Sequence, residues 1–201
     1  MNIHANAPAP SRWPRVEDTG KCTCRRICAR PRLKSQIITA QAKPVNSSAA
    51  ALVADKRFKC TECGKCCSGA GEVWVSEVEC MGIAAHLNLQ LEDFFSTYCK
   101  SFSKVVGWRM LKYKAGTDKD CIFLEDKLCS IYTVRPTQCA TYPWWPDLMD
   151  PVSWQVEAAE VCEGLDHEDA ASLDVRQASE KLMTAAEYFV MKDAAPRRTK
   201  T

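Results

Sequence analysis

The sequence predicts an α+β fold: one small domain of short strands and helices around cysteine-rich loops, with a long helix at its C-terminal end. Three observations favour this class. Short segments alternate polar and apolar residues, as strands do, and other segments repeat apolar residues at helical spacing. Loops that contain cysteine interrupt both kinds of segment, and eight of the 13 cysteines lie in them.

The first elements of the domain carry clear local signals. Residues 72–75 alternate and are typical of a short strand. Ser76 and Glu79 then have the spacing of a capping box, which predicts that a helix starts here and runs to about Leu87. Apolar residues at helical spacing predict a second helix over residues 90–102.

The middle of the chain favours strands and one short helix. Residues 108–113 and 121–124 are expected to be strands, and residues 128–132 are expected to pair with 121–124 across the connection 125–127. Pro136 then stands where a short helix can begin, because proline is tolerated in a first turn.

The last third predicts one more strand and the longest helix. Residues 154–156 are expected to be the strand, and residues 169–193 the helix. An apolar stripe on that helix indicates a core-facing side, and it consists of Leu173, Ala178, Leu182, Ala185, Ala186, Phe189 and Val190.

Residues 1–55 differ from the rest of the chain. They are rich in Ala and Arg and contain nine Lys or Arg but three acidic residues, which is typical of an organelle transit peptide. No apolar core of a secretory signal is present in them. We therefore expect a disordered, removable leader at 1–55 that directs the protein to the chloroplast, with the mitochondrion as the alternative, and one domain at 56–201.

Charge and hydropathy limit the partners of that domain. Residues 56–201 hold 18 of the 27 basic residues and 22 of the 25 acidic ones, so no basic groove for nucleic acid is expected. No run of about 18 apolar residues occurs, so no membrane span is expected either. The sequence names no protein partner.

Cysteine spacing is the strongest chemical signal. Cys60, Cys63, Cys66 and Cys67 form what we call the first cysteine loop, residues 60–67. Thiolates at this spacing can turn back onto one soft or borderline metal ion. Four later cysteines lie in segments expected to be ordered: Cys121, Cys129, Cys139 and Cys162. Cys80 and Cys99 fall in helical patterns and are expected to act as small apolar residues.

The spacing leaves the kind of metal centre open. Eight thiolates could hold two single ions, a shared pair of ions, or one iron–sulfur cluster with spare thiols. The adjacent Cys66 and Cys67 favour two neighbouring metals, because successive side chains of an extended backbone point apart. Basic residues near the cysteines could offset the thiolate charge: Lys59, Lys65, Lys127 and Arg135.

Other chemistries have weaker signals. Cys63-Gly-Lys-Cys66 has the form of a redox dithiol, but it lies between two further cysteines and not in a βαβ unit. His167-Glu168 lacks the second histidine of a zincin motif.

These motifs together resemble a known family, the zinc- or iron-chelating domain with a CxxCxxCC core, some of whose bacterial members carry a flagellin lysine N-methylase label. The resemblance covers about residues 58–165 and implies that all eight cysteines of the loops are ligands. Two positions depart from the family pattern: Ala140 follows Cys139 where arginine is usual, and Glu163 replaces the proline of Cys-Pro-Gly.

We therefore expect an organelle-targeted protein that holds zinc or iron through its cysteine thiolates. The alternatives are an iron–sulfur redox protein and an enzyme similar to a protein lysine methyltransferase, for which the sequence offers no methyl-donor site.

Overall fold

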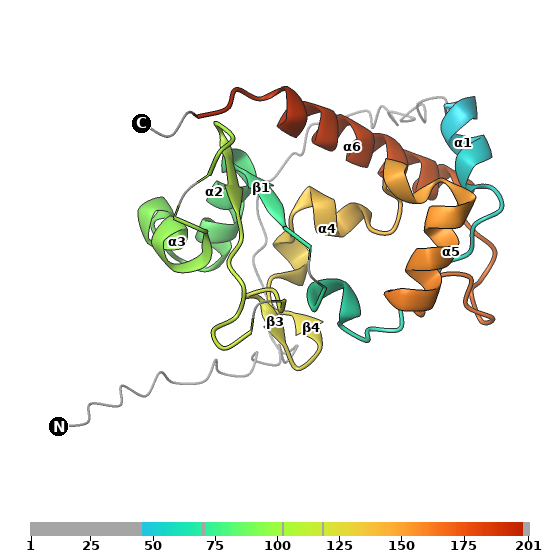
Figure 1. Cartoon of the computed structure of the whole chain (residues 1–201), viewed down its shortest axis with the longest axis horizontal. Coiled ribbons are helices and arrows are strands. Elements are labelled where there is room, and N and C mark those ends of the chain that lie inside the picture. Colours follow the sequence, from blue (N-terminus) through green and yellow to red (C-terminus); the bar gives the residue numbers. More distant parts are fainter. Residues whose placement is uncertain (1–45, 70, 102, 118, 199–201) are drawn as a thin grey trace, which may run out of the picture. The chain divides into compact units, whose positions relative to one another are not determined.

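The computed structural model describes residues 46–198 except 70, 102 and 118, and within them it has the α+β class that the sequence predicts (Figure 1). Its helices are α1 (Ser47–Val53), α2 (Glu77–His86), α3 (Leu91–Tyr98), α4 (Thr137–Thr141), α5 (Pro151–Glu160) and α6 (Val175–Ala194). Its 3₁₀ turns are η1 (Lys65–Cys67), η2 (Tyr132–Val134) and η3 (Pro146–Leu148). None of the helices in these residues is long and apolar enough to cross a membrane.

Two small antiparallel sheets hold the strands. In one, β1 (Trp74–Ser76) pairs with β2 (Trp108–Met110), with Val75 opposite Arg109. In the other, β3 (Leu124–Glu125) pairs with β4 (Leu128–Cys129). The two residues between β3 and β4 both have positive φ, as a tight hairpin turn requires, which confirms the expected hairpin.

Several boundaries differ from those expected. The strand predicted at 154–156 is wrong, because these residues lie inside α5. Asp150 accepts a hydrogen bond from the Ser153 N–H, and Pro151 occupies the first turn. These two helix-start signals outweigh the strand propensity of the β-branched residues that follow. The last helix begins at Val175, six residues after the expected start, and Asp174 caps it.

Part of the expected leader belongs to the folded unit. Residues 1–45 lie outside the described part, but residues 47–53 form α1, where the sequence analysis expects disorder. Ala49 and Val53 of α1 are buried and pack with Ala178 and Leu182 of α6 in one apolar cluster. Whether and where a leader is cleaved stays a prediction.

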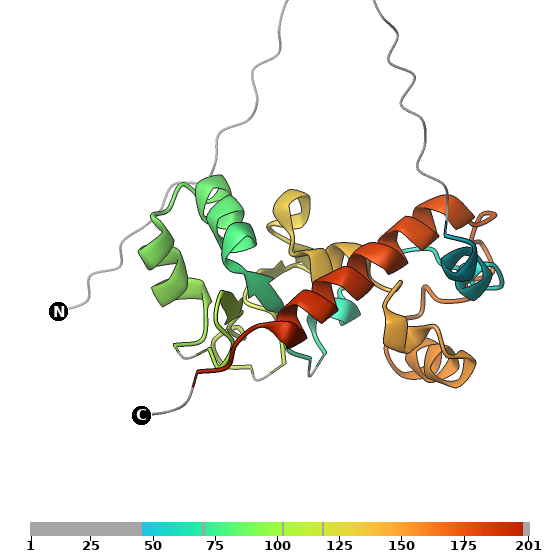
Figure 2. The same cartoon turned by 90° about the horizontal axis from the view of Figure 1, so that it is seen from above.

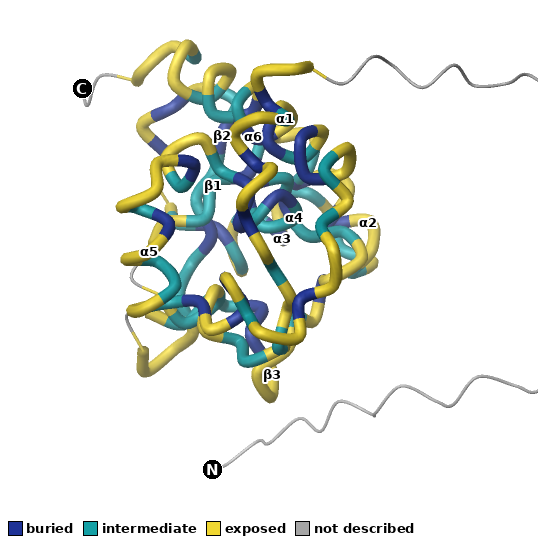
Figure 3. The backbone as a smooth tube through the Cα atoms, turned by 90° about the vertical axis from the view of Figure 1, so that its right-hand side faces the viewer, coloured by how far each residue is buried: buried dark blue, intermediate teal, exposed yellow. Residues whose placement is uncertain are grey.

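Helix α6 joins two parts of the core. Figures 1 and 2 show it running along the molecule from α1 to the region of β1 and α2. Its N-terminal half contributes Ala178 and Leu182 to the cluster around Trp144 and Trp154, whereas Tyr188 packs against Trp108. Val190, expected in the apolar stripe, is instead 68% exposed. Buried residues are spread over many segments and do not form one layer (Figure 3).

The carboxylate of Glu79 connects these parts. It accepts hydrogen bonds from the Ser76 N–H at 2.9 Å and the Ser76 hydroxyl at 2.7 Å, which completes the expected capping box. It also accepts from the Thr137 N–H at 2.7 Å and from the Tyr188 hydroxyl at 3.0 Å. One side chain of α2 thereby holds β1, the start of α4 and α6.

Replacing this carboxylate is expected to destabilise the whole fold. Burial would raise the pKa of Glu79, but its hydrogen bonds with Thr137 and Ser76 hold the pKa below the ordinary value of 4.5. The stabilisation is therefore complete above about pH 4.5 and is lost as the pH falls through the lower, folded-state pKa. Glu79→Gln should lower the free energy of unfolding at pH 7 by about 2–3 kcal/mol. It should also make the free energy of unfolding less dependent on pH in the acid range, as measured by urea unfolding at several pH values.

The matched control is Glu77→Gln, in the same first turn of α2. Its side chain is half exposed, with Arg109 at 4.0 Å, so a change within about 0.5 kcal/mol is expected. Equal losses in the two variants would contradict the role given to Glu79.

Candidate metal centre

The first cysteine loop turns sharply at its centre. Gly64 has φ +77°, and η1 follows directly, so Cys66 and Cys67 lie in a 3₁₀ turn and not in extended backbone. Cys60 and Cys66 are exposed, and Cys63 and Cys67 are half-buried. The turn provides the bend that a loop with four closely spaced thiols needs.

On one side this loop packs against the β3–β4 hairpin. The Cys121 N–H donates a hydrogen bond to the Cys67 carbonyl at 2.7 Å. A side chain on Gly64 would lie 2.8 Å from the Lys127 carbonyl oxygen, so only glycine permits this approach to the hairpin turn. These contacts bring Cys121 and Cys129 to the Cys66–Cys67 end of the loop.

Cys139 of α4 lies in the same region. Burial raises the pKa of its thiol to about 12, and the nearby charges of Cys121, Cys129 and Cys66 add to the increase. Five of the eight predicted ligands therefore form one electrostatically connected group, in which each thiol influences the pKa of at least one other: Cys66, Cys67, Cys121, Cys129 and Cys139.

On its other side the loop packs against the segment that carries Cys162. The Lys59 N–H donates to the Gly164 carbonyl at 2.9 Å, and a side chain on Gly164 would clash with the Lys59 carbonyl. Burial raises the pKa of the Cys162 thiol, and the nearby charge of Cys63 adds to the increase, so these two cysteines lie on the same side of the loop. The structure thus divides the predicted ligands between two sides of one loop.

Backbone N–H groups point at three of the thiols. The sulfur of Cys121 accepts from the Phe123 N–H, and that of Cys129 accepts from the Ile131 N–H. The sulfur of Cys162 accepts from the N–H groups of Gly164 and Leu165. Burial raises the pKa of all three thiols, and in each case the donor two residues on offsets part of that increase and so favours the thiolate, which is the form that binds a metal.

Charged residues around the thiols have different partners from those expected. Lys65 is bound to Glu163 at 2.6 Å and Lys59 to Asp169 at 3.3 Å, so both are already paired. Arg135 stacks on the Tyr132 ring at 3.8 Å. Burial raises the pKa of Cys129 and contact with Cys67 lowers that of Cys66, and in both cases the charge of Arg135 favours the thiolate. Of the four expected basic residues, Arg135 therefore has the clearest effect on the thiols.

Cys66 and Cys67 are not equivalent. Their thiols are hydrogen-bonded, and this contact first of all lowers the pKa of Cys66 and raises that of Cys67. Cys66 is thus the member of the pair that forms a thiolate more easily.

The thiols gather without forming a finished coordination sphere. Among the described residues, no group of three or more Cys, His, Asp or Glu side chains surrounds one point closely enough to hold a metal ion. All ten cysteines of these residues are free of disulfides. The donor type and the N–H groups behind the sulfurs suit a thiolate-bound metal, but the sulfur atoms must approach one another to share one.

Sequence reasoning did not identify the role of Glu163. Its carboxylate binds Lys65 and also accepts a hydrogen bond from the Thr61 hydroxyl at 3.0 Å, so it links the first cysteine loop to the Cys162 segment. The departure from Cys-Pro-Gly at this position was the available signal, since proline cannot form such a pair.

Adding a methyl group at Gly164 should separate these two segments. Because that methyl would meet the Lys59 carbonyl carbon and oxygen, Gly164→Ala is expected to lower the free energy of unfolding by about 1–3 kcal/mol. Thermal unfolding monitored by circular dichroism measures the loss.

The control is Gly82→Ala in α2, where a methyl meets no atom within 4 Å and helix propensity improves. This variant should be as stable as the parent or more so. A Gly164→Ala protein as stable as the Gly82→Ala protein would show that the close approach has no energetic importance.

Comparison with known proteins identifies related sequences. Residues 59–173, more than half of the chain, match the family described as "Putative zinc- or iron-chelating domain", with the CxxCxxCC pattern. An uncharacterized protein of Methanocaldococcus jannaschii, MJ0661, is 32% identical over 89 residues, which are 43% of this chain and 44% of that protein. The chain thus aligns with less than half of this relative's length. No solved structure matches the chain.

Proposed function

Because the chain belongs to the zinc- or iron-chelating domain family, we propose that it binds zinc or iron through the thiolates on the two sides of its first cysteine loop. One set would be Cys66 or Cys67 with Cys121, Cys129 and Cys139. The other would include Cys60, Cys63 and Cys162.

The observation that carries it is the set of backbone N–H groups directed at the sulfurs. Cys121, Cys129 and Cys162 each accept a hydrogen bond from the residue two positions further on. Such hydrogen bonds stabilise negative charge on sulfur and orient it, as the surroundings of thiolate ligands do. Thiols that served only as small apolar residues would have no need of them.

Electrostatics supports the same reading. Burial and mutual repulsion both oppose the formation of several thiolates around Cys139, and Arg135 offsets only part of that repulsion. A divalent cation would remove the repulsion and bring the sulfurs together. Metal binding should then release protons and weaken as the pH falls, because the thiols must ionise first.

The proposal is tested by metal content. The full chain, prepared without oxygen, should contain stoichiometric zinc or iron. Relative to this parent, the Cys121→Ser and Cys139→Ser proteins should each contain about one metal ion fewer, or should no longer bind metal tightly. Elemental analysis measures the metal content, and thermal unfolding before and after treatment with a chelator measures the stability that the metal provides. Inorganic sulfide with absorbance near 400 nm would identify the metal as an iron–sulfur cluster.

The control is Cys80→Ala, which removes a buried thiol outside both sets. It should leave the metal content unchanged. A parent protein without stoichiometric metal, or equal metal loss in all three variants, would contradict the proposed ligands.

We also propose that the segment before α1 directs the protein to an organelle, the chloroplast before the mitochondrion. Its many arginines and few acids support this. Cleavage after residue 55 would remove Ala49 and Val53 from the core, so the mature chain should begin at or before residue 46. N-terminal sequencing of the imported protein measures this, and a mature start beyond Val53 or failure of import would contradict it.

A further inference from the structure

A second pair of thiols lies away from the candidate metal centre. Cys80 of α2 and Cys99, the residue after α3, are 0% and 1% exposed and belong to the same apolar cluster. Their thiols interact, and each is the largest influence on the pKa of the other. Nothing in the metal proposal uses either residue.

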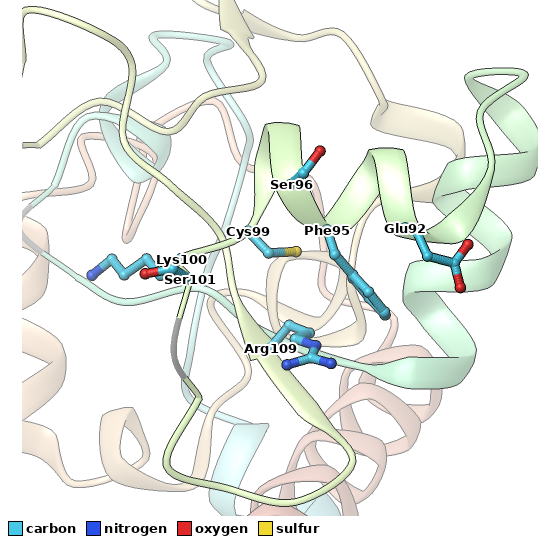
Figure 4. A pocket seen from close by; sticks show the side chains of 7 residues that line it. All are labelled: Glu92, Phe95, Ser96, Cys99, Lys100, Ser101 and Arg109. Carbon is cyan, nitrogen blue, oxygen red and sulfur yellow. The ribbon is translucent and has the colours of Figure 1, made fainter. Parts of the chain in front are cut away.

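A surface hollow leads to one member of this pair. Its volume is about 360 Å³, and its lining includes Phe95, Cys99, Lys100 and Arg109. Figure 4 shows the Cys99 side chain beside Phe95 and Arg109 at the wall of this hollow. Cys99 therefore faces a space that a small molecule can enter, with Cys80 behind it in the core.

Arg109 supplies positive charge and an unused donor at this place. Its guanidinium lies over the Phe95 ring at 4.3 Å, and Glu77 approaches it only to 4.0 Å. Its buried Nε has no hydrogen-bond partner among the residues that the structure describes. A buried unpaired N–H is costly, which favours an acceptor atom arriving from the hollow.

We propose that Cys99 and Cys80 form a redox-active dithiol, in which Cys99 reacts with a small hydroperoxide that enters the hollow and Cys80 resolves the product to a disulfide. The hollow favours this division of roles, because Cys99 lines it and Cys80 is fully buried, and the surrounding charges act in the same direction. The pKa of Cys99 is lowered by the hydrogen bond from Cys80 and then by Arg109 and Lys112, although burial opposes them. Three influences raise the pKa of Cys80 and keep it protonated: its contact with Cys99, burial, and the charge of Glu79.

The chemistry balances in two steps. The Cys99 thiolate attacks one peroxide oxygen, the O–O bond breaks, and the departing alkoxide or hydroxide takes a proton, which leaves a sulfenic acid on Cys99. The Cys80 sulfur then attacks the Cys99 sulfur, an S–S bond forms, the S–O bond breaks, and hydroxide leaves with the Cys80 proton as water. Two thiols lose two electrons and the peroxide gains them. Arg109 lines the same hollow, so its guanidinium charge can stabilise the negative charge on the peroxide oxygen that leaves.

The test uses the full chain with hydrogen peroxide. After oxidation and alkylation, cleavage by trypsin together with a glutamate-specific protease separates residues 80–92, which contain Cys80, from residues 93–100, which contain Cys99. Mass spectrometry should find these two peptides joined by a disulfide at stoichiometric peroxide, and a reductant should separate them. A pair that stays reduced while other cysteines oxidise would overturn the proposal, as would Cys99 joined to any cysteine other than Cys80.

Variants test the roles separately. Cys80→Ala should trap a sulfenic acid on Cys99 that dimedone labels, and Cys99→Ala should leave Cys80 unoxidised. Arg109→Gln should slow disulfide formation about tenfold and Arg109→Lys should restore part of the rate. An unchanged rate in Arg109→Gln would refute the role of Arg109. Metal content that stays constant in Cys80→Ala separates this proposal from the metal site.

Discussion

One buried carboxylate joins segments that are far apart in the sequence. Glu79 accepts hydrogen bonds from Ser76, from the Thr137 backbone and from Tyr188, so it fixes β1, α4 and α6 around the start of α2. Cys139 is two residues beyond Thr137, and its position therefore depends on this carboxylate. The place where thiols meet is set by a residue that has no metal chemistry of its own.

The cysteines divide by their surroundings. Those of the two loop sides are exposed, half-buried or supported by backbone N–H groups, and the charge of Arg135 favours the thiolates of Cys66 and Cys129. Cys80 and Cys99 lie in an apolar cluster with Arg109 at its margin. The same side chain is therefore suited to binding a cation in one setting and to donating electrons in the other, because burial and neighbouring charge decide when sulfur loses its proton.

The sequence could predict features that depend on neighbouring residues. The Ser76–Glu79 capping box and the hairpin around residues 125–127 were predicted correctly because their signals are local. The α5 helix was missed because residues 154–156 alternate like a strand, and the helix start at Asp150 and Pro151 was not recognised.

Long-range features were beyond such reasoning. The contact of Glu163 with Lys65 joins residues 98 positions apart, and no spacing rule reports it. The exposure of Val190 could not be predicted for the same reason. Periodicity identifies the apolar face of a helix, but it does not show how far along that face the packing partner extends. The division of the ligands between two loop sides likewise follows from backbone contacts at Gly64 and Gly164 that only the folded chain contains.

The packing of α1 on α6 affects the order of folding. Val53 and Leu182 meet near the two ends of the described chain, and every segment that carries a ligand cysteine lies between them. A polypeptide still leaving the ribosome lacks this last contact, and contacts of such long sequence separation form slowly. The thiols would stay accessible throughout that interval, so newly made chains depend on a reducing environment, or on early capture of a cation, until the C-terminal helix arrives.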